Sequence, residues 1–154
     1  MEYEIFERDF IVRTLKILNQ YETLVMGKVA ESEQFEVTLL INCLLGLLVL
    51  PKERCYVSIP ELSLDQLTEW GLAPEFIQSW GNHPHNLKPE QYCTLLEIVQ
   101  RLRNGVAHTH VKPLGNGNEI TKLEFTDRNG FRAVVPVQNL KIFVTKLAQS
   151  VKPL

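Results

Sequence analysis

The predicted fold depends most on the end of one amphipathic helix, which consists of Arg101-Leu102-Arg103-Asn104-Gly105-Val106-Ala107-His108-Thr109-His110. The helix is expected to run from about Lys88 to His108, with its apolar side in the core. No carboxylate occurs between Ile98 and Asn118, so two arginines, an amide and two imidazoles form a cationic strip in a chain of net charge -2. We expect this strip to attract a phosphate group.

Apolar residues recur at helical spacing along most of the chain. The run over residues 35–50 is apolar on all sides, so we expect it at the centre of a helical bundle. Ser63 and Gln66 match a capping box, and Gly71 supplies the stop for a short helix. Helices are expected over about residues 5–26, 32–50, 63–71, 74–80, 88–108 and 137–151.

Alternating hydropathy replaces the helical pattern after a turn-rich loop over residues 113–118. Residues 121–125 alternate, residues 127–130 are a strong turn signal, and residues 131–135 form the return strand of a hairpin. The predicted fold class is therefore mainly α. We expect a single domain over residues 1–154, an up-and-down helical bundle with one small β-hairpin before the last helix.

Composition and charge limit the classes of function. A chain of 154 residues with 45% apolar content suits one domain, and a pI near 6.1 argues against a general nucleic-acid coat protein. Cys43, Cys55 and Cys93 fit buried free thiols in a reducing cytosol. Residues 35–50 are too short a run to span a bilayer, and no signal peptide is recognisable, so we expect a cytoplasmic protein without membrane contact.

The polar face of the helix over residues 88–108 carries groups suited to cleavage of a phosphodiester in RNA. A helical wheel places four side chains opposite the core residue Val99: Glu97, Arg101, Asn104 and His108. Arg103 lies near the edge of the apolar stripe, and Gly105 is expected to kink the last turn and bring Arg103 closer to His108. An imidazole can accept or donate the proton, and a guanidinium can hold two phosphate oxygens. Because His108 supplies one proton-transfer group, a symmetric dimer is expected to supply two.

The segment from Arg103 to His108 resembles the motif of HEPN ribonucleases, in which an arginine and a polar residue precede a histidine. The rest of the chain is similar to a bacterial plasmid-borne HEPN family linked with host defence and toxin-antitoxin systems. The resemblance implies an all-α homodimer with a composite cleft and metal-independent endoribonuclease activity that leaves a 2′,3′-cyclic phosphate. It implies Arg103, Asn104 and His108 as catalytic residues, no cofactor, and RNA and an antitoxin protein as partners.

Two arginines compete for the catalytic role. Arg101 has a suitable spacing to His108 and is favoured by the helical wheel, whereas Asn104 directly after Arg103 favours Arg103. We assign catalysis to Arg103. Phosphate contacts with RNA are expected from three further residues: Arg101, His110 and Lys112.

Other interpretations of the same residues stay open. A non-catalytic module would use this fold to bind RNA, a nucleotide or a regulatory protein, and a scaffold protein with a fortuitous motif comes third. His83 and His85 could join His108 and His110 in a metal site, although histidines beside a loop proline are more typical of an ordinary surface. HEPN toxins paired with nucleotidyltransferase antitoxins often have a tyrosine at the position of His110, so silencing by tyrosine adenylylation is not expected here.

Overall fold

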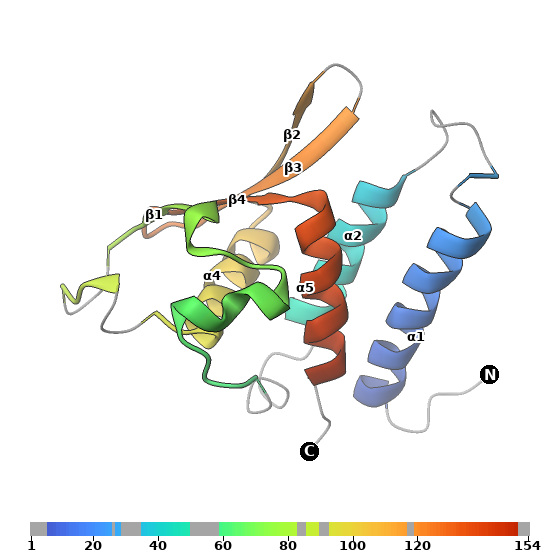
Figure 1. Ribbon diagram of the computed structural model, residues 1–154, viewed down its shortest axis with the longest axis horizontal. Helices are drawn as coiled ribbons and strands as arrows, with labels where there is room; N and C mark the ends of the chain where they lie inside the picture. The colour runs from blue at the N-terminus through green and yellow to red at the C-terminus, as the bar shows by residue number, and fades with distance from the viewer. Residues whose placement is uncertain are drawn as a thin grey trace.

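A four-stranded antiparallel sheet lies across a layer of helices (Figure 1). The computed structural model describes residues 6–25, 27–28, 35–49, 59–82, 86–89, 93–116 and 119–150. In spatial order the strands are β1 (Ile77–Trp80), β4 (Phe131–Pro136), β3 (Glu119–Thr126) and β2 (Val111–Asn116). β2 and β1 therefore form the two edges of the sheet.

The helices follow the predicted order. α1 (Phe6–Gln20) continues into a π-helical turn (Tyr21–Val25), and α2 (Glu36–Leu44) continues into another (Leu45–Val49). Two 3-10 helices follow (Leu64–Trp70 and Pro74–Phe76), and then α4 (Leu95–Ala107) and α5 (Val137–Ser150). α4 and α5 pack against β3, while α1 lies at the outer side of the helical layer, against α2 and α5 (Figure 1).

The short helix predicted from the capping box is confirmed. The backbone N–H of Ser63 donates to the side-chain oxygen of Gln66, and Gly71 ends the helix in the left-handed conformation, with φ 69°. The helix is of the tighter 3-10 form. Its Trp70 side chain is buried in the core against Phe143 of α5, with ring centroids 6.5 Å apart.

Helix α4 begins later than predicted. Thr94 is its N-cap, and the Thr94 hydroxyl accepts a hydrogen bond from the backbone N–H of Glu97 at 3.4 Å. The expected start near Lys88 relied on Pro89 as a first helical residue, and residues 90–92 lie outside the described residues. Thr94 is a second helix-start signal besides Pro89, and it sets the N-terminus of α4.

The prediction of a mainly α bundle with one small hairpin is wrong, because the fold is mixed α/β. The hairpin of β3 and β4 is confirmed, with Leu123 paired to Val135 and Phe125 to Ala133. Two strands were not expected: Ile77–Trp80 falls in a predicted helix, and most of Val111–Asn116 falls in the loop predicted over residues 113–118.

The two errors have different physical reasons. β1 pairs with β4, more than fifty positions later in the chain, and so has no local signal. β2 contains Pro113 and Gly115, which are typical of loops. Pro113 is tolerated because β2 is an edge strand. On the side that pairs with no other strand, a missing N–H removes no hydrogen bond of the sheet.

The core lies between the sheet and the helices. Leu123, Phe125, Phe131, Ala133 and Val135 alternate along β3 and β4 and are buried against α4 and α5. The expected central helix is confirmed by α2, in which Leu40 and Leu44 are fully buried. None of the described helices is long and apolar enough to cross a membrane.

The described cysteines are buried free thiols, as expected. Cys43 lies in α2 and Cys93 lies just before α4, and both are buried, while Cys55 lies outside the described residues. Burial raises the pKa of the Cys43 thiol to about 11. Because the thiolate is the reactive form, Cys43 is a packing residue at neutral pH.

Replacing Gly71 by alanine is expected to destabilise the fold through a specific contact. A Cβ at Gly71 would lie 2.4 Å from the carbonyl oxygen of Asn139 in α5, whereas a Cβ at Gly27 would meet nothing within 4 Å. Both glycines have positive φ, which costs an alanine roughly 1–2 kcal/mol. Gly71→Ala should therefore lose roughly 1–3 kcal/mol more unfolding free energy than the control Gly27→Ala in urea denaturation. Equal losses would mean that this turn is not packed on α5.

Candidate functional site

The last residues of the cationic strip form an exposed turn where α4 leaves the core. The backbone N–H groups of His108, Thr109 and His110 donate to the carbonyls of Asn104, Val106 and Gly105, at 3.1, 3.2 and 2.7 Å. Thr109 takes a left-handed conformation, with φ 57°. The chain therefore turns sharply after the helix and presents exposed side chains of His108 and His110.

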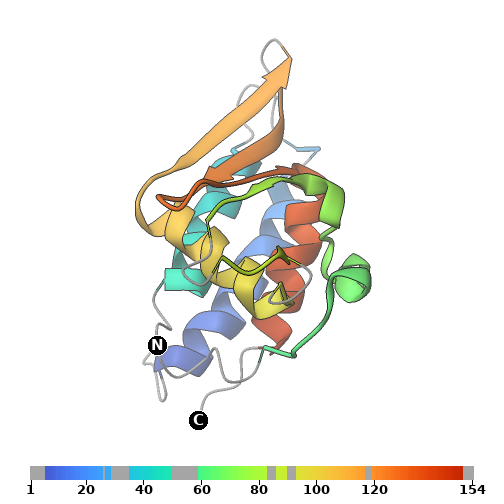
Figure 2. The same ribbon diagram turned by 90° about the vertical axis from the view of Figure 1, so that its left-hand side faces the viewer.

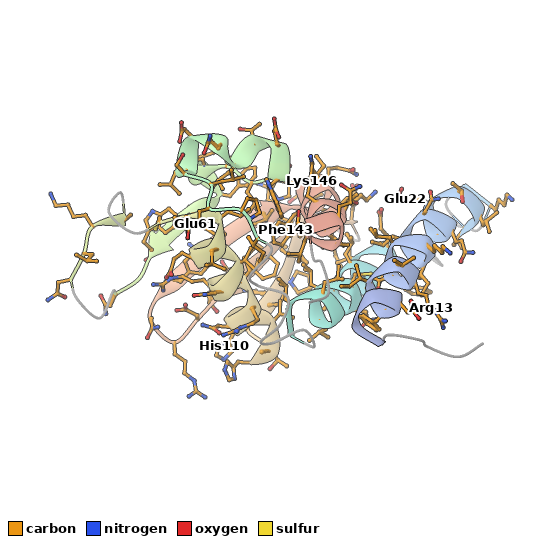
Figure 3. The ribbon with its side chains drawn as sticks, turned by 90° about the horizontal axis from the view of Figure 1, so that it is seen from below. Arg13, Glu22, Glu61, His110, Phe143 and Lys146 are labelled. Atoms are coloured by element: carbon orange, nitrogen blue, oxygen red, sulfur yellow. The ribbon has the colours of Figure 1, made fainter. Side chains whose placement is uncertain are left out.

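Two imidazoles share this turn. The ring centroids of His108 and His110 lie 6.3 Å apart, with the ring planes inclined by 41°. Figure 3 shows His110 at the rim of the molecule beside the end of α4. A phosphate approaching this rim would meet two imidazole side chains.

Arg103 is held beside the turn by its neighbour. Its Nη2 atom donates to Oδ1 of Asn104 at 3.1 Å, and both side chains are half-buried. Asn104 precedes His108 by four residues, so their positions share one face of the helix. The hydrogen bond therefore joins the guanidinium of Arg103 to a residue on the same helix face as His108.

Arg101 does not lie on a solvent face. Only 5% of its surface is exposed, and its Nε atom donates to Glu97 at 2.9 Å. Its Nη1 atom donates to Asp127 at 3.2 Å, and its guanidinium lies 5.7 Å from the ring centre of Phe131. The expectation of a solvated position for Arg101 was wrong, because a wheel cannot show that the hairpin covers this side of α4.

Asp127 organises the turn that covers Arg101. Its side chain is 3% exposed, and its Oδ1 atom accepts the backbone N–H groups of Asn129 at 2.7 Å and Phe131 at 3.1 Å. The other oxygen, Oδ2, accepts from Arg101. The sequence predicted Asp127 only as a turn residue. Its place two positions before Asn129-Gly130 is the signal for its second role, because an aspartate there accepts hydrogen bonds from the backbone of the turn.

Gly105 serves close packing and not a kink. The helix continues through Gly105 to Ala107, and a Cβ at Gly105 would lie 3.0 Å from the carbonyl oxygen of Thr126. The end of β3 therefore approaches the helix backbone at this glycine. His110 joins the same contact, since its carbonyl accepts the N–H of Thr126 at 3.1 Å.

The remaining predicted residues divide into two groups. Lys112 is exposed on β2, two residues after His110, and so extends the cationic surface. His83 and His85, which an imidazole metal site would need, lie outside the described residues. In the part of the chain that is described, no three His, Cys, Asp or Glu side chains are grouped so as to hold a metal ion.

The comparisons with known proteins point to one family. A family model described as HEPN pEK499 p136 matches residues 1–153, which is nearly the whole chain. No curated protein and no solved structure matches the chain.

Breaking the pair of Arg101 and Asp127 is expected to destabilise the fold strongly. Arg101→Met leaves the buried carboxylate of Asp127 without its cation, which costs about 3–5 kcal/mol of unfolding free energy. The matched control is Arg132→Met, because Arg132 is 51% exposed in its ion pair with Glu124 and should cost less than about 1 kcal/mol. Chemical denaturation measures both. Similar losses in the two variants would show that the buried pair does not hold the hairpin.

Proposed function

The chain belongs to the HEPN pEK499 p136 family, and on that basis we propose that it is a metal-independent endoribonuclease. Arg103, Asn104 and His108 are its catalytic residues. The observation that carries the proposal is the exposed turn after α4, where the Arg103 guanidinium is held by Asn104, and Asn104 precedes the exposed His108 by four residues.

The chemistry follows from the side chains at this turn. His108 takes the proton of a ribose 2′-OH, and the 2′-oxygen attacks the adjacent phosphorus. The guanidinium of Arg103 stabilises the charge that grows on the phosphate oxygens. The bond to the 5′-oxygen breaks, and this leaving oxygen receives a proton from a second group. The products are a 2′,3′-cyclic phosphate and a 5′-hydroxyl.

The second proton-transfer group comes from a second copy of the chain. Each chain supplies one His108, and a symmetric dimer that joins two such turns would place two imidazoles in one cleft. In this arrangement His110 and Lys112 contact RNA phosphates. Arg101 holds the hairpin on the helix, because its guanidinium is already engaged by Glu97 and Asp127.

We place this activity in a cytoplasmic toxin or host-defence effector. The support is the family, together with the resemblance of the motif to HEPN toxins. Such a ribonuclease requires control, and an antitoxin protein is the proposed partner. His110 stands where many HEPN toxins have a tyrosine, so this control would act by binding and not by adenylylation of that position.

Cleavage of RNA in EDTA is the direct test. The native protein should degrade total RNA and leave cyclic phosphate ends, which end analysis detects. His108→Ala and Arg103→Ala should each lower the rate by about 10²-fold or more. The control is Arg13→Ala, which removes an arginine of α1 that lies well away from His110 (Figure 3) and should keep the native rate.

The opposite result would identify a different class of function. Intact RNA after incubation with the native protein, combined with measurable RNA binding that survives His108→Ala, would contradict catalysis. It would favour a non-catalytic module that holds RNA.

Subunit mixing tests the composite site. If cleavage requires two copies of His108, only dimers of two native chains are active, and a random equal mixture with His108→Ala should keep about one quarter of the activity. A site complete within one chain would keep about one half. The second result would contradict the composite site and direct attention to His110 as the second group, because its ring lies 6.3 Å from that of His108. The measurement is the cleavage rate after exchange of subunits at fixed total protein.

A further inference from the structure

The hairpin of β2 and β3 projects beyond the helices as an arm. Figures 1 and 2 both show its far end extending away from the body of the molecule. The first four residues of β3, from Glu119 to Lys122, are exposed, and burial begins only at Leu123. The exposed end of this arm adds little to the core, so core packing does not explain which side chains its surface carries.

One face of the arm carries its cationic side chains. Leu123 and Phe125 are buried toward the helices, so strand alternation directs Lys122 and Glu124 to the outer face. On β2, Lys112 stands opposite Glu124, and Leu114 stands opposite Lys122. Lys112 and Lys122 are therefore diagonal neighbours on one surface.

The charge of this face is not cancelled by its carboxylates. Glu124 is engaged by Arg132 of β4, whose Nε atom donates to Oε2 at 2.8 Å. Among the described residues, no ion pair joins Lys112 or Lys122 to a carboxylate. Glu119 lies at the tip beyond a shift of register, and its pairing with β2 places it on the same face as Lys122. The cations Lys112, Lys122 and Arg132 still outnumber the two carboxylates of this face. The outer face therefore keeps a net positive charge.

This face is continuous with the candidate active site. His110 stands one pair beyond Val111 in the ladder, since its carbonyl accepts the N–H of Thr126. Alternation places His110 on the same side as Lys112, and two residues of a strand cover about 7 Å. The row His110, Lys112 and Lys122 thus leads from the end of α4 outward along the arm.

We propose that the outer face of the β2–β3 arm binds the phosphate backbone of RNA that flanks the cleaved bond. Lys112 was expected from the sequence, whereas Lys122 and the shared surface come from the strand register. The proposal rests on the ribonuclease function for its choice of ligand. On this proposal the arm favours long RNA substrates over short ones and does not distinguish base sequences.

The side chains of the arm favour RNA over a protein strand. Pro113 and Lys112 lie on the open edge of β2, where a proline and a lysine both oppose pairing with another strand. The outer positions of β2 and β3 hold no aromatic side chain for stacking on bases. Contacts to phosphates alone are electrostatic and independent of sequence.

The test is RNA binding by the full chain with cleavage suppressed. A labelled single-stranded RNA of about 20 nucleotides is titrated with His108→Ala protein in EDTA, and fluorescence anisotropy is measured at several salt concentrations. Adding Lys112→Ala and Lys122→Ala should weaken binding roughly tenfold and reduce the slope of log K against log salt by about 1.4. The matched control adds Lys16→Ala and Lys146→Ala, which remove the same charge from α1 and α5 and should change binding less than about twofold.

The outcomes separate this proposal from the ribonuclease function. If the arm and control variants bind RNA equally, or if no variant binds it, the arm proposal is overturned, whatever the native protein cleaves. If the arm variant alone loses affinity while the native protein cleaves nothing, the arm is a surface that binds RNA phosphates, and the ribonuclease function fails. A third comparison uses cleavage by proteins with His108 intact. The measured quantity is kcat/KM for the long RNA divided by kcat/KM for a tetranucleotide. The arm substitutions should lower this ratio, and an unchanged ratio would contradict a preference of the arm for long RNA.

Discussion

The ion pair between Arg101 and Asp127 joins helix α4 to the hairpin of β3 and β4. Arg101 lies on α4, Asp127 begins the turn between β3 and β4, and both side chains are almost fully buried. A buried charge is costly unless it is paired and hydrogen-bonded. Asp127 satisfies this condition twice, since it accepts from Arg101 and from the backbone of its own turn. The pair therefore holds the β3–β4 hairpin on α4, and Glu97 accepts a further hydrogen bond from the guanidinium.

The position of the hairpin determines which part of the cationic strip reaches solvent. The β3–β4 turn covers Arg101, and the end of β3 lies against Gly105, so the exposed groups begin at the last turn of α4. His108 and His110 emerge there, and β2 starts directly afterwards. The exposed histidine turn and the projecting arm thus arise from one packing arrangement. This arrangement places the strands β2 and β3 beside the segment from Arg103 to His108, and a helical bundle alone would lack that surface.

Local patterns predicted the elements that depend on local interactions. The helical spacing of α1, α2 and α5, the capping box at Ser63 and the turn before Gly130 each depend on residues close together in the sequence, and the structure has them all. The family resemblance, carried by the residues from Arg103 to His108, is confirmed by the family match. β1 escaped prediction because it pairs with β4 far along the chain, where propensity is a weak guide, and β2 escaped because Pro113 and Gly115 are typical of loops.

The sequence by itself determined the chemical groups of the candidate site and their spacing along α4, because an arginine, an asparagine and a histidine within six positions stay within two turns of any helix. Their catalytic role stays a prediction. Only the tertiary structure decided that Arg101 is a buried structural cation, that Gly105 is a contact point for β3, and that Lys112 and Lys122 share one face. The reason is that burial, ion pairing and strand register depend on segments that meet only when the hairpin packs on the helix.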